Sequence, residues 1–285
     1  MKHALAIDLG GTELRVGLVD EEGGILSQCS TKTAANDGPA AVLDQMKNLI
    51  DQVLDTRRGI ELEGIGVGSP GPLDPFEGVV IRAPTLRHWI NVPLRDMVSK
   101  MTGLRTVINN DGNVGALGEF HFGAGQGYQD IVYVSVGTGI GGGVIIDGRL
   151  LLGRKGLAAE IGHMSISDVG PVCNCGNQGC WEALASGGAL ALRRERHALG
   201  IRDQTKLLEE EARYLGIGIT NLLHIFSPEC VILGGGVAQI FDQLVGTITE
   251  TVQKRAMPPF RDVPIVAATL GSNAGLVGAG CLILR

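Results

Sequence analysis

Two distant stretches of the chain repeat one pattern, and this repeat constrains the fold more than any other feature. Each stretch reads as an apolar strand, a glycine turn, a second strand, a turn with an acidic residue and glycine, and a third strand. Aligning the two stretches places Gly137 on Gly10 and Asp147 on Asp20. Self-similarity over so long a separation favours two related domains over a solenoid. Apolar strands also resemble one another by chance, but the shared glycine turn makes duplication the better explanation.

Helices and strands alternate through the rest of the chain, which predicts an α/β protein in two lobes. A helix with Pro39 in its first turn is expected after Asp37, whose side chain can cap it. The strand at 64–68 runs into an S-P-G-P loop, which continues neither a strand nor a helix. The other expected elements are a strand at 105–109, helices at 93–101, 112–122, 181–199 and 206–226, strands at 230–233 and 265–268 with a helix between them, and a C-terminal helix of small residues.

Composition and charge exclude several classes of protein. The net charge is −6 and no lysine-rich block occurs, so we expect no nucleic-acid partner. No apolar run approaches the length of a membrane span, and the N-terminus reaches Asp8 too early for a signal peptide. Cys29, Cys230 and Cys281 lie apart in apolar or strand-like contexts that are typical of buried thiols. These features predict a cytoplasmic protein without membrane contacts.

The densest group of metal-binding side chains lies within residues 160–182. His163, Cys173, Cys175 and Cys180 follow the spacing H-x9-C-x-C-x4-C. A Cys₃His set is a closed tetrahedral zinc site, because thiolate and imidazole suit a borderline-soft cation. Interspersed glycines allow the chain to fold tightly around one ion. The stretch begins and ends with a glutamate, which indicates that the metal holds a binding site in place, although either glutamate alone is typical of a solvated surface charge.

Three glycine turns directly follow strands and can bring backbone N–H groups close to phosphate. Their residues are Gly10, Gly11 and Thr12, then Gly137, Thr138 and Gly139, and finally Gly234, Gly235 and Gly236. Neither a Walker lysine motif nor a G-x-G-x-x-G after the first strand is present. A single turn of this kind is more often part of a hairpin or a cap, but three in one chain favour a bound nucleotide.

Six motifs run in a fixed order across nearly the whole chain. They are I-D-L-G-G-T at 7–12, I-N-N-D-G-N at 108–113, V-G-T-G-I-G-G-G at 136–143, E-I-G-H at 160–163, C-N-C-G-N-Q-G-C-W-E at 173–182 and V-I-L-G-G-G-V at 231–237. With these motifs the chain resembles the ROK family of repressors, open reading frames and kinases. The resemblance implies a two-lobed actin-like ATPase fold of the ribonuclease H-like type. Its lobes would be 1–110 with the helix at about 273–285, and 111–272 with the zinc loop.

The resemblance also implies an activity, the ATP-dependent phosphorylation of a hexose, most often glucose, at its 6-hydroxyl. Asp111 would be the general base, and the alternative for Asp111 is a helix N-cap. The implied sugar-binding residues are Gly68, Asn110, Asp111, Glu160, His163 and Glu182. The implied cofactors are ATP, Mg²⁺ and structural Zn²⁺, with Asp8 facing the Mg²⁺–phosphate group and the glycine turns binding the nucleotide. A homodimer or homotetramer is expected.

Four departures from the family pattern concern the substrate and the surrounding loops. Thr85 stands where many members have an asparagine that touches the sugar, and Glu13 replaces a frequent lysine. Ala159 replaces the usual glycine before E-I-G-H, which we interpret as a mild change, and the connection at 202–205 is short.

The alternatives to a glucose kinase differ in how far they depart from it. A kinase for N-acetylmannosamine or N-acetylglucosamine would use the same chemistry on another sugar. A catalytically silent sugar-binding protein would not need the base Asp111. Repressors of the family carry a DNA-binding module before I-D-L-G-G-T, and because this motif begins at residue 7 we expect none here.

Overall fold

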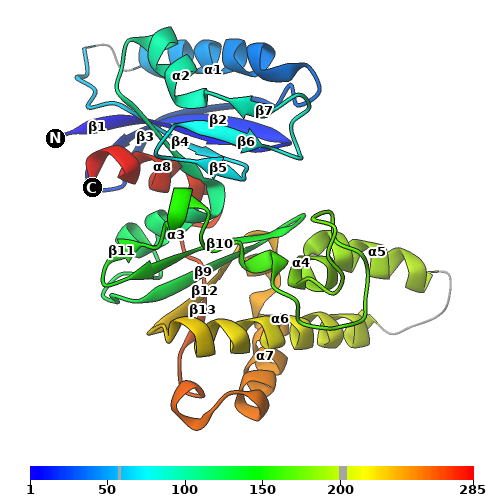
Figure 1. Ribbon diagram of the computed structural model, residues 1–285. Helices are drawn as coiled ribbons and strands as arrows, with labels where there is room; N and C mark the ends of the chain where they lie inside the picture. The colour runs from blue at the N-terminus through cyan, green and yellow to red at the C-terminus, as the bar shows by residue number, and fades with distance from the viewer. Residues whose placement is uncertain (57–58, 199–203) are drawn as a thin grey trace. The chain divides into compact units, whose positions relative to one another are not determined.

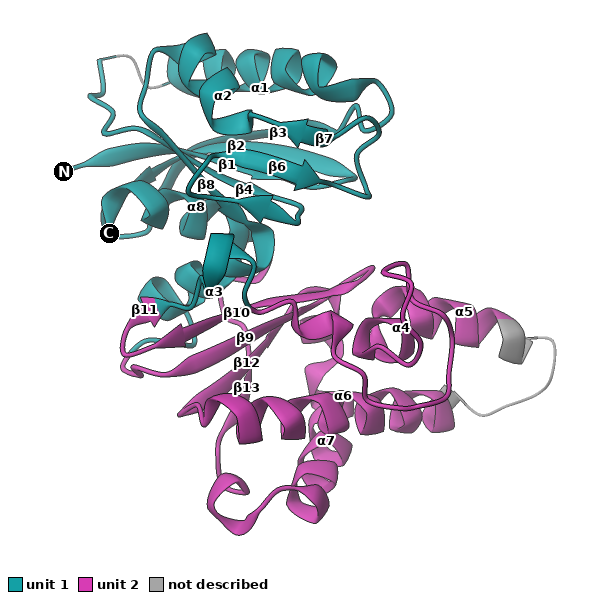
Figure 2. Ribbon diagram, viewed as in Figure 1, with its two compact units in different colours: residues 1–126, 150–158, 272–285 teal, residues 127–149, 159–271 magenta. Residues whose placement is uncertain are grey.

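The computed structural model describes residues 1–56, 59–198 and 204–285, which form two compact units (Figure 2). Unit 1 comprises residues 1–126, 150–158 and 272–285, and unit 2 comprises 127–149 and 159–271. The sequence places all of 111–272 in one lobe, whereas α3 (Asp111–Phe122) and residues 150–158 group with unit 1. Helix α3 groups with unit 1 because it packs extensively against the C-terminal helix α8 (Ala274–Leu284).

Unit 1 is built on a five-stranded sheet in the order β3-β2-β1-β4-β8, whose strands are labelled in Figure 2. Its strands are β1 (His3–Leu9), β2 (Glu13–Asp20), β3 (Ile25–Lys32), β4 (Ile65–Ser69) and β8 (Thr106–Asn110). The first three strands are antiparallel neighbours, while β4 pairs in parallel with both β1 and β8. The repeat predicted at the N-terminus is therefore the antiparallel half of this sheet.

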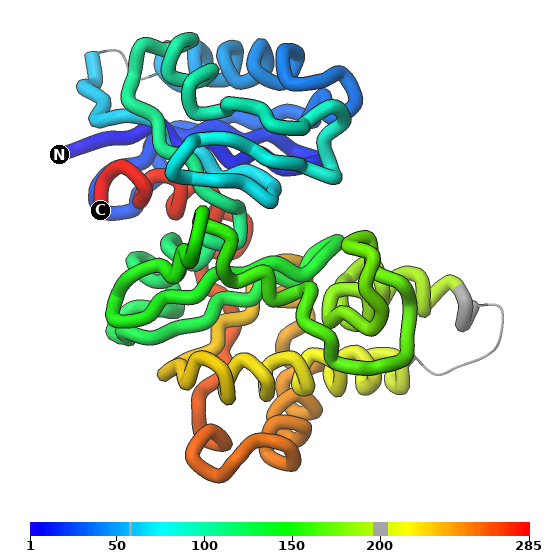
Figure 3. The backbone as a smooth tube through the Cα atoms, viewed as in Figure 1, coloured from blue at the N-terminus to red at the C-terminus, as the bar shows by residue number. Residues whose placement is uncertain are grey.

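Helices cover both faces of the unit 1 sheet because β1 is apolar on both sides. Leu5 and Ile7 contribute to a core shared with α1 (Gly38–Asp55) and α2 (Leu94–Thr102), whereas Ala6 packs with α3 and α8 (Figure 1). Small residues on α8 let it approach closely: a Cβ on Gly278 would lie 1.8 Å from the carbonyl oxygen of Val114. Both chain termini belong to unit 1, and Figure 3 marks them on the backbone trace.

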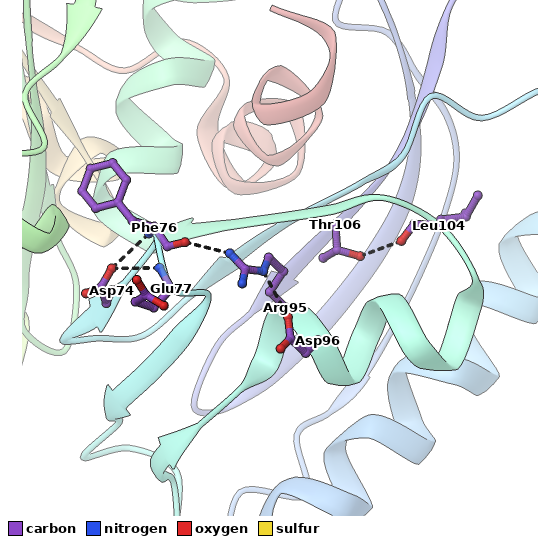
Figure 4. A network of polar contacts seen from close by, with 7 residues as sticks. All are labelled: Asp74, Phe76, Glu77, Arg95, Asp96, Leu104 and Thr106. Atoms are coloured by element: carbon purple, nitrogen blue, oxygen red, sulfur yellow. Dashed lines mark hydrogen bonds and ion pairs between the residues drawn. The ribbon is translucent and has the colours of Figure 1, made fainter.

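A small antiparallel sheet in unit 1 was not expected from the sequence. It consists of β5 (Leu73–Asp74), β6 (Val79–Arg82) and β7 (Ile90–Val92), which are too short to show a periodic pattern. Asp74 Oδ1 accepts hydrogen bonds from the N–H groups of Phe76 and Glu77 at 3.0 and 3.1 Å (Figure 4). Arg95 at the start of α2 donates to the Phe76 carbonyl at 2.8 Å, so the turn between β5 and β6 is held from two sides.

Unit 2 repeats the topology of unit 1, which confirms the predicted duplication. Its sheet has the order β11-β10-β9-β12-β13, with β9 and β10 antiparallel and β12 parallel to both β9 and β13. The strands are β9 (Ile131–Val136), β10 (Ile140–Ile146), β11 (Arg149–Leu150), β12 (Cys230–Gly234) and β13 (Ile265–Ala267). The strand order is the same in both sheets once the strands are renumbered from the start of each repeat.

The helix expected at 181–199 is wrong as a single element. It is two helices, α4 (Trp181–Ala185) and α5 (Gly187–Ala198), separated by Ser186 in an extended conformation, and residue 199 lies outside the described residues. The break exists because the N–H groups of Gly187 and Gly188 donate to carbonyls of the 137–138 turn instead of continuing the helix.

The remaining helices of unit 2 agree with expectation, apart from a 3-10 turn, Gly236–Ile240, that precedes α7. They are α6 (Gln204–Phe226) and α7 (Phe241–Arg255). Short 3-10 turns also occur at Arg154–Gly156, Ile161–His163, Pro258–Phe260 and Gly271–Asn273. Among the described residues, no helix combines the length and the apolar character needed to cross a membrane.

Candidate active site

Parallel strands in unit 1 bring several predicted residues to one edge of the sheet. The pairing places Asp8 beside Gly68, Gly68 beside Asn109, and Ser69 beside Asn110. In open α/β sheets, ligands bind outside the carboxyl ends of parallel strands. Gly68 is buried, and a Cβ there would lie 3.3 Å from a methyl group of Val114, so any contact that it makes with a ligand would come from its backbone.

Asn110 and Asp111 stand at the junction of β8 and α3 and differ in role. Asn110 is the N-cap of α3, and its Oδ1 accepts from the Gly112 N–H at 2.9 Å. Asp111 is the first helical residue and is exposed, and its Oδ1 lies 2.8 Å from the same N–H. Asn110 thus occupies the capping position proposed for Asp111. Because a carboxylate offers about four lone-pair sites, Asp111 can still accept a proton from a substrate.

Two buried asparagines support this junction and were not singled out in the sequence. Asn109 Oδ1 accepts from the Asn110 N–H at 2.8 Å and from Asn113 Nδ2 at 3.0 Å. Both Asn109 and Asn113 are almost fully buried. A hydrogen-bonded amide pair at the strand–helix junction fixes the direction in which the chain enters α3. The feature of the sequence that could have pointed to this role is that both asparagines lie within the I-N-N-D-G-N motif.

The first glycine turn is closed by backbone bonds and packs against Thr85. The Gly10 N–H donates to the Glu13 carbonyl at 2.9 Å, and Thr33 Oγ1 donates to the Gly10 carbonyl at 2.8 Å. A Cβ on Gly11 would lie 2.6 Å from the Cβ of Thr85. Thr85, the departure from the family asparagine, therefore abuts the glycine turn, while Thr12 and Glu13 are exposed beside it.

Asp8 has a cationic partner that the sequence reasoning missed. Arg15 faces Asp8 across the β1–β2 pairing, and its Nη2 forms an ion pair with Asp8 Oδ2. Each side chain is 18% exposed, so the pair is screened from water more than a surface salt bridge would be. A Cβ on Gly275 would lie 2.4 Å from Asp8 Oδ2, which places the carboxylate against the first turn of α8. The sequence did contain an indication of this ion pair: Arg15 follows Asp8 by seven residues on the second strand of the predicted hairpin, and the two residues have opposite charges.

The four predicted metal ligands form one cluster in unit 2. The ligand atoms of His163, Cys173, Cys175 and Cys180 all lie within 4.8 Å of one another. Cys173 Sγ is 3.6 Å from His163 Nδ1, and Cys175 Sγ is 3.6 Å from Cys180 Sγ. Zinc bonds of about 2.0–2.3 Å in a tetrahedron separate neighbouring ligand atoms by roughly 3.5–3.8 Å. The donor set and its spacing therefore fit a structural zinc ion.

Hydrogen bonds within the metal loop hold these ligands in place. Asn177 donates its side-chain N–H to Ser165 Oγ at 2.9 Å and to Cys180 Sγ at 3.5 Å, and its carbonyl accepts from the Cys173 N–H at 2.8 Å. Burial raises the pKa of the Cys173 thiol, and that of Cys180 to about 12, whereas the Asn177 backbone N–H lowers the pKa of Cys175. The raised pKa values mean that the buried thiols of Cys173 and Cys180 are hard to ionise without a metal. A bound cation would offset this, because a thiol that coordinates a metal is deprotonated.

His163 and Glu160 lie at the open side of the cluster. The Nδ1 atom of His163 faces Cys173, so Nε2, on the other side of the ring, points away from the thiols. Both residues are exposed. Desolvation by the surrounding protein and the neighbouring Glu182 raise the pKa of the Glu160 carboxyl, and His163 opposes this. The group thus offers an imidazole nitrogen and a carboxyl to a polar ligand.

Glu182 connects the metal loop with the second glycine turn. Its Oε2 accepts from the Ile140 N–H at 3.0 Å, and its Oε1 lies 3.9 Å from Cys173 Sγ. A Cβ on Gly139 would lie only 2.3 Å from Oε2. The structure therefore gives Glu182 a contact that the sequence did not predict, in addition to its place beside Glu160.

The second and third glycine turns meet at the carboxyl ends of neighbouring parallel strands in unit 2. Gly234 at the end of β12 pairs with Ser135 of β9. Gly235 has a φ of +74°, and a Cβ there would lie 2.5 Å from the Val136 carbonyl oxygen, which requires glycine on both counts. The first turn belongs to unit 1, so two of the three predicted turns are brought together here.

Ala159 is not the mild replacement that the sequence suggested. Its φ is +65°, in the left-handed region that glycine adopts without penalty and alanine does not. The residue directly precedes Glu160 and begins the second segment of unit 2. Of the connection at 202–205, residues 202 and 203 lie outside the described part of the chain.

Comparison with known proteins finds relatives that match almost the entire chain. The family model for the ROK family matches residues 4–285. A glucokinase of Thermotoga maritima is 37% identical over 98% of this chain and 96% of its own length. A ROK family glucokinase of Streptomyces griseus, solved in complex with glucose and AMPPNP, is 33% identical with a TM-score of 0.84 over 99% of both chains. A putative N-acetylmannosamine kinase of Listeria monocytogenes is 27% identical with a TM-score of 0.82 over 99% of this chain and 98% of its own.

Proposed function

The chain belongs to the ROK family, and we propose that it is a sugar kinase that transfers the γ-phosphoryl group of ATP to the 6-hydroxyl of glucose. The observation that carries this proposal is the exposed carboxylate of Asp111 at the end of a parallel strand, within the I-N-N-D-G-N motif. Similarity to the Streptomyces griseus enzyme with bound glucose and AMPPNP over nearly the full length supports it.

In the proposed reaction, Asp111 accepts the proton of the 6-hydroxyl as its oxygen forms a bond to the γ-phosphorus. The bond from that phosphorus to the β,γ-bridging oxygen breaks, and ADP leaves. A positioned general base contributes about 10²–10⁴-fold, and positioning with charge stabilisation contributes most of the rest. Asn110, Glu160, His163 and Glu182, with the backbone of Gly68, hydrogen-bond the sugar hydroxyls.

The phosphates are assigned to the glycine turns, whose backbone N–H groups can face anions. The Gly10–Thr12 and Gly137–Gly139 turns bind the phosphates, and Gly234–Gly236 lies near the adenosine. When bound with ATP, Mg²⁺ would neutralise charge that develops on the phosphoryl group, and Asp8 would face it. Because Asp8 forms an ion pair with Arg15 in this structure, Asp8 could face Mg²⁺ in one of two ways. Either the ion pair would separate, or the Asp8 carboxylate would interact with Arg15 and Mg²⁺ together.

Zinc would be held by His163, Cys173, Cys175 and Cys180, and it would keep the sugar-binding side chains ordered. This role follows from the loop itself, because Glu160, His163 and Glu182 all lie on it or at its ends. The Nδ1 atom of His163 would bind the metal, which leaves Nε2 for a sugar hydroxyl.

A kinase for N-acetylmannosamine or N-acetylglucosamine is the second candidate. Similarity to the putative N-acetylmannosamine kinase favours it, while Thr85, in place of an asparagine that would touch the sugar, weakens the assignment of glucose without pointing to another sugar. We also propose that the enzyme is cytoplasmic, because its cysteines are free and form no disulfide framework. For the oligomeric state we propose a homodimer or homotetramer, which light scattering of the purified protein would identify.

The decisive experiment measures ADP release by the purified protein with ATP, Mg²⁺ and a panel of hexoses. We expect sugar-dependent turnover with the highest kcat/KM for glucose. A higher value for an N-acetylhexosamine would favour the second candidate, and no sugar-dependent turnover at all would contradict the kinase proposal.

A further inference from the structure

The second glycine turn is held from outside by the chain segment that begins in the metal loop. The Ile140 N–H donates to Glu182 Oε2 at 3.0 Å, the Gly187 N–H donates to the Gly137 carbonyl at 2.8 Å, and the Gly188 N–H donates to the Thr138 carbonyl at 3.3 Å. All of these groups belong to unit 2. Three residues of the turn, Gly137, Thr138 and Ile140, are therefore bonded to residues on α4 or at the start of α5.

The fit between these segments leaves no room for the turn to shift toward them. A Cβ on Gly139 would lie 2.3 Å from Glu182 Oε2, and one on Gly187 would lie 2.7 Å from the Gly137 carbonyl oxygen. One on Gly162, which follows Glu160 by two residues, would lie 2.1 Å from the Ile140 carbonyl oxygen. The turn is thus in close contact with both the metal loop and the α4–α5 junction.

Glu182 is the one charged group in this set of three bonds. A hydrogen bond from a backbone N–H to a carboxylate is stronger than one between neutral groups. Its other oxygen, Oε1, lies 3.9 Å from Cys173 Sγ, so the same side chain touches the metal loop and the glycine turn. Trp181, the preceding residue, is fully buried and donates to the Tyr214 carbonyl of α6 at 3.1 Å, which fixes the base of the Glu182 side chain.

We propose that Glu182 is a positioning residue for the nucleotide: its carboxylate fixes the Gly137–Ile140 turn in the conformation that receives the phosphates of ATP. This inference rests on the proposed function, and it adds a role on the phosphoryl-donor side to a residue assigned to the sugar. Loss of the carboxylate then weakens nucleotide binding even when no sugar is present.

The test is the affinity for AMPPNP with Mg²⁺, measured by calorimetry without sugar, for the wild-type protein and its variants. We expect Glu182→Ala to raise the Kd about tenfold, since removing a partner of a charged hydrogen bond typically has this effect or more. Glu182→Gln keeps an acceptor oxygen for the Ile140 N–H and should stay within about threefold of wild type. Glu160→Ala is the matched control, because it removes a carboxylate from the same loop, and it should weaken sugar binding only.

A second readout is hydrogen exchange of the Ile140 amide by NMR, which should be slowed in the wild-type protein and faster in Glu182→Ala. If that variant fails to fold or loses zinc, Glu182→Asp replaces it, because it keeps the charge but shortens the reach toward Ile140 by one methylene. Wild-type nucleotide affinity in folded Ala or Asp variants would overturn the proposal. The absence of nucleotide binding or turnover in the wild-type protein would instead contradict the proposed function.

Discussion

At the scale of single residues, the junction of β8 and α3 divides two tasks between neighbours. Asn110 caps the helix through its side chain, and Asp111 presents an exposed carboxylate from the first turn. Both side chains lie within hydrogen-bond distance of the Gly112 N–H, at 2.9 Å for Asn110 and 2.8 Å for Asp111, so the cap does not depend on Asp111 alone. The chemistry and the local fold can therefore be separated by mutation.

Asp111→Asn should lower kcat by about 10²–10⁴-fold, because the amide cannot accept the proton of the hydroxyl. Sugar affinity, measured by calorimetry, should stay within a few-fold of wild type. Asp37→Asn is the control, since Asp37 precedes α1 without a capping hydrogen bond, and it should change neither quantity. Unfolding of Asp111→Asn would instead indicate a structural role.

Ala159→Gly should stabilise the protein by about 1 kcal/mol, because a left-handed φ of +65° strains alanine but not glycine. The measurement is the free energy of unfolding from urea titration. Ala158→Gly is the neighbouring control: Ala158 does not have a positive φ, and glycine there should destabilise by up to about 1 kcal/mol. A loss of stability in Ala159→Gly would contradict the argument from strain.

At the scale of elements, the metal loop (residues 160–182) contains little regular secondary structure, and we expect a bound metal ion to keep it ordered. Among its described residues, β-type pairing is limited to two isolated bridges, Ser165 with Cys180 and Val172 with Gln178. Such a loop buries little apolar surface, as the exposure of Val169 and Val172 illustrates. We therefore expect metal binding to supply the free energy of ordering that packing does not.

Cys175→Ser should lose zinc and sugar affinity together, because the order of the sugar-binding side chains depends on the metal. Cys175 is exposed, so the substitution itself disturbs no packing. Metal content by mass spectrometry and sugar affinity by calorimetry check this, with Cys29→Ser on β3 as the control. Zinc loss with unchanged sugar affinity would contradict this prediction and would show that the metal serves only the structure of the loop.

Helix α6 carries a buried carboxyl that makes stability depend on pH. Glu211 is fully buried with Oε2 paired to Arg193, while its Oε1 has no hydrogen-bond partner within the described part of the chain. Burial raises the pKa of Glu211 to about 7 despite Arg193. Because the folded state binds this proton more tightly than the unfolded state, the associated stability is present below about pH 4.5 and is lost as the pH rises to 7.

Glu211→Gln should therefore gain stability relative to wild type by about 3 kcal/mol between pH 4.5 and 8, since glutamine does not ionise. Urea unfolding at several pH values measures this difference. Glu209→Gln on the exposed side of α6 should show no such trend. A difference between Glu211→Gln and wild type that does not change with pH would contradict the assignment.

At the scale of the whole molecule, each unit is assembled from segments that are far apart in the sequence. Unit 1 needs the C-terminal helix α8, which packs against α3, β1 and β4 through small residues. A Cβ on Gly66 would lie 1.7 Å from the Ala279 carbonyl oxygen, so strand and helix are in backbone contact. The last residues of the chain are thus part of the core that carries Asp8 and Asp111.

Gly278→Ala should destabilise the protein by about 3 kcal/mol, because the added methyl group forces α8 away from the Val114 carbonyl. Gly246→Ala is a matched control in helix α7, where a Cβ meets open space, and it should stabilise by about 0.5–1 kcal/mol. Thermal and urea unfolding compare the two. Equal effects would show that helix propensity, and not the close packing of α8, governs both sites.

Much of the site could be predicted because it depends on residues close together in the sequence. The four metal ligands lie within one stretch, and the glycine turns follow strands whose apolar pattern is clear. The juxtaposition of Asp8, Gly68 and Asn109 was not predicted, because it results from the parallel pairing of β1, β4 and β8, which are far apart in the sequence. The short strands β5 to β7 and the break at Ser186 escaped prediction, since neither leaves a periodic signal.

The sequence by itself determined the duplicated α/β architecture, the spacing of the four candidate metal ligands and the family of the chain, because strand periodicity, turn chemistry and ligand spacing are local properties. The tertiary structure decided that Arg15 pairs with Asp8, that Thr85 abuts the first glycine turn, and that Glu182 bonds to Ile140. Arg15 and Asp8 are neighbours across the hairpin of β1 and β2, whereas the other two contacts join residues whose spacing along the chain carries no pattern. Those two contacts arise only when packing of the sheets and helices brings separate segments together.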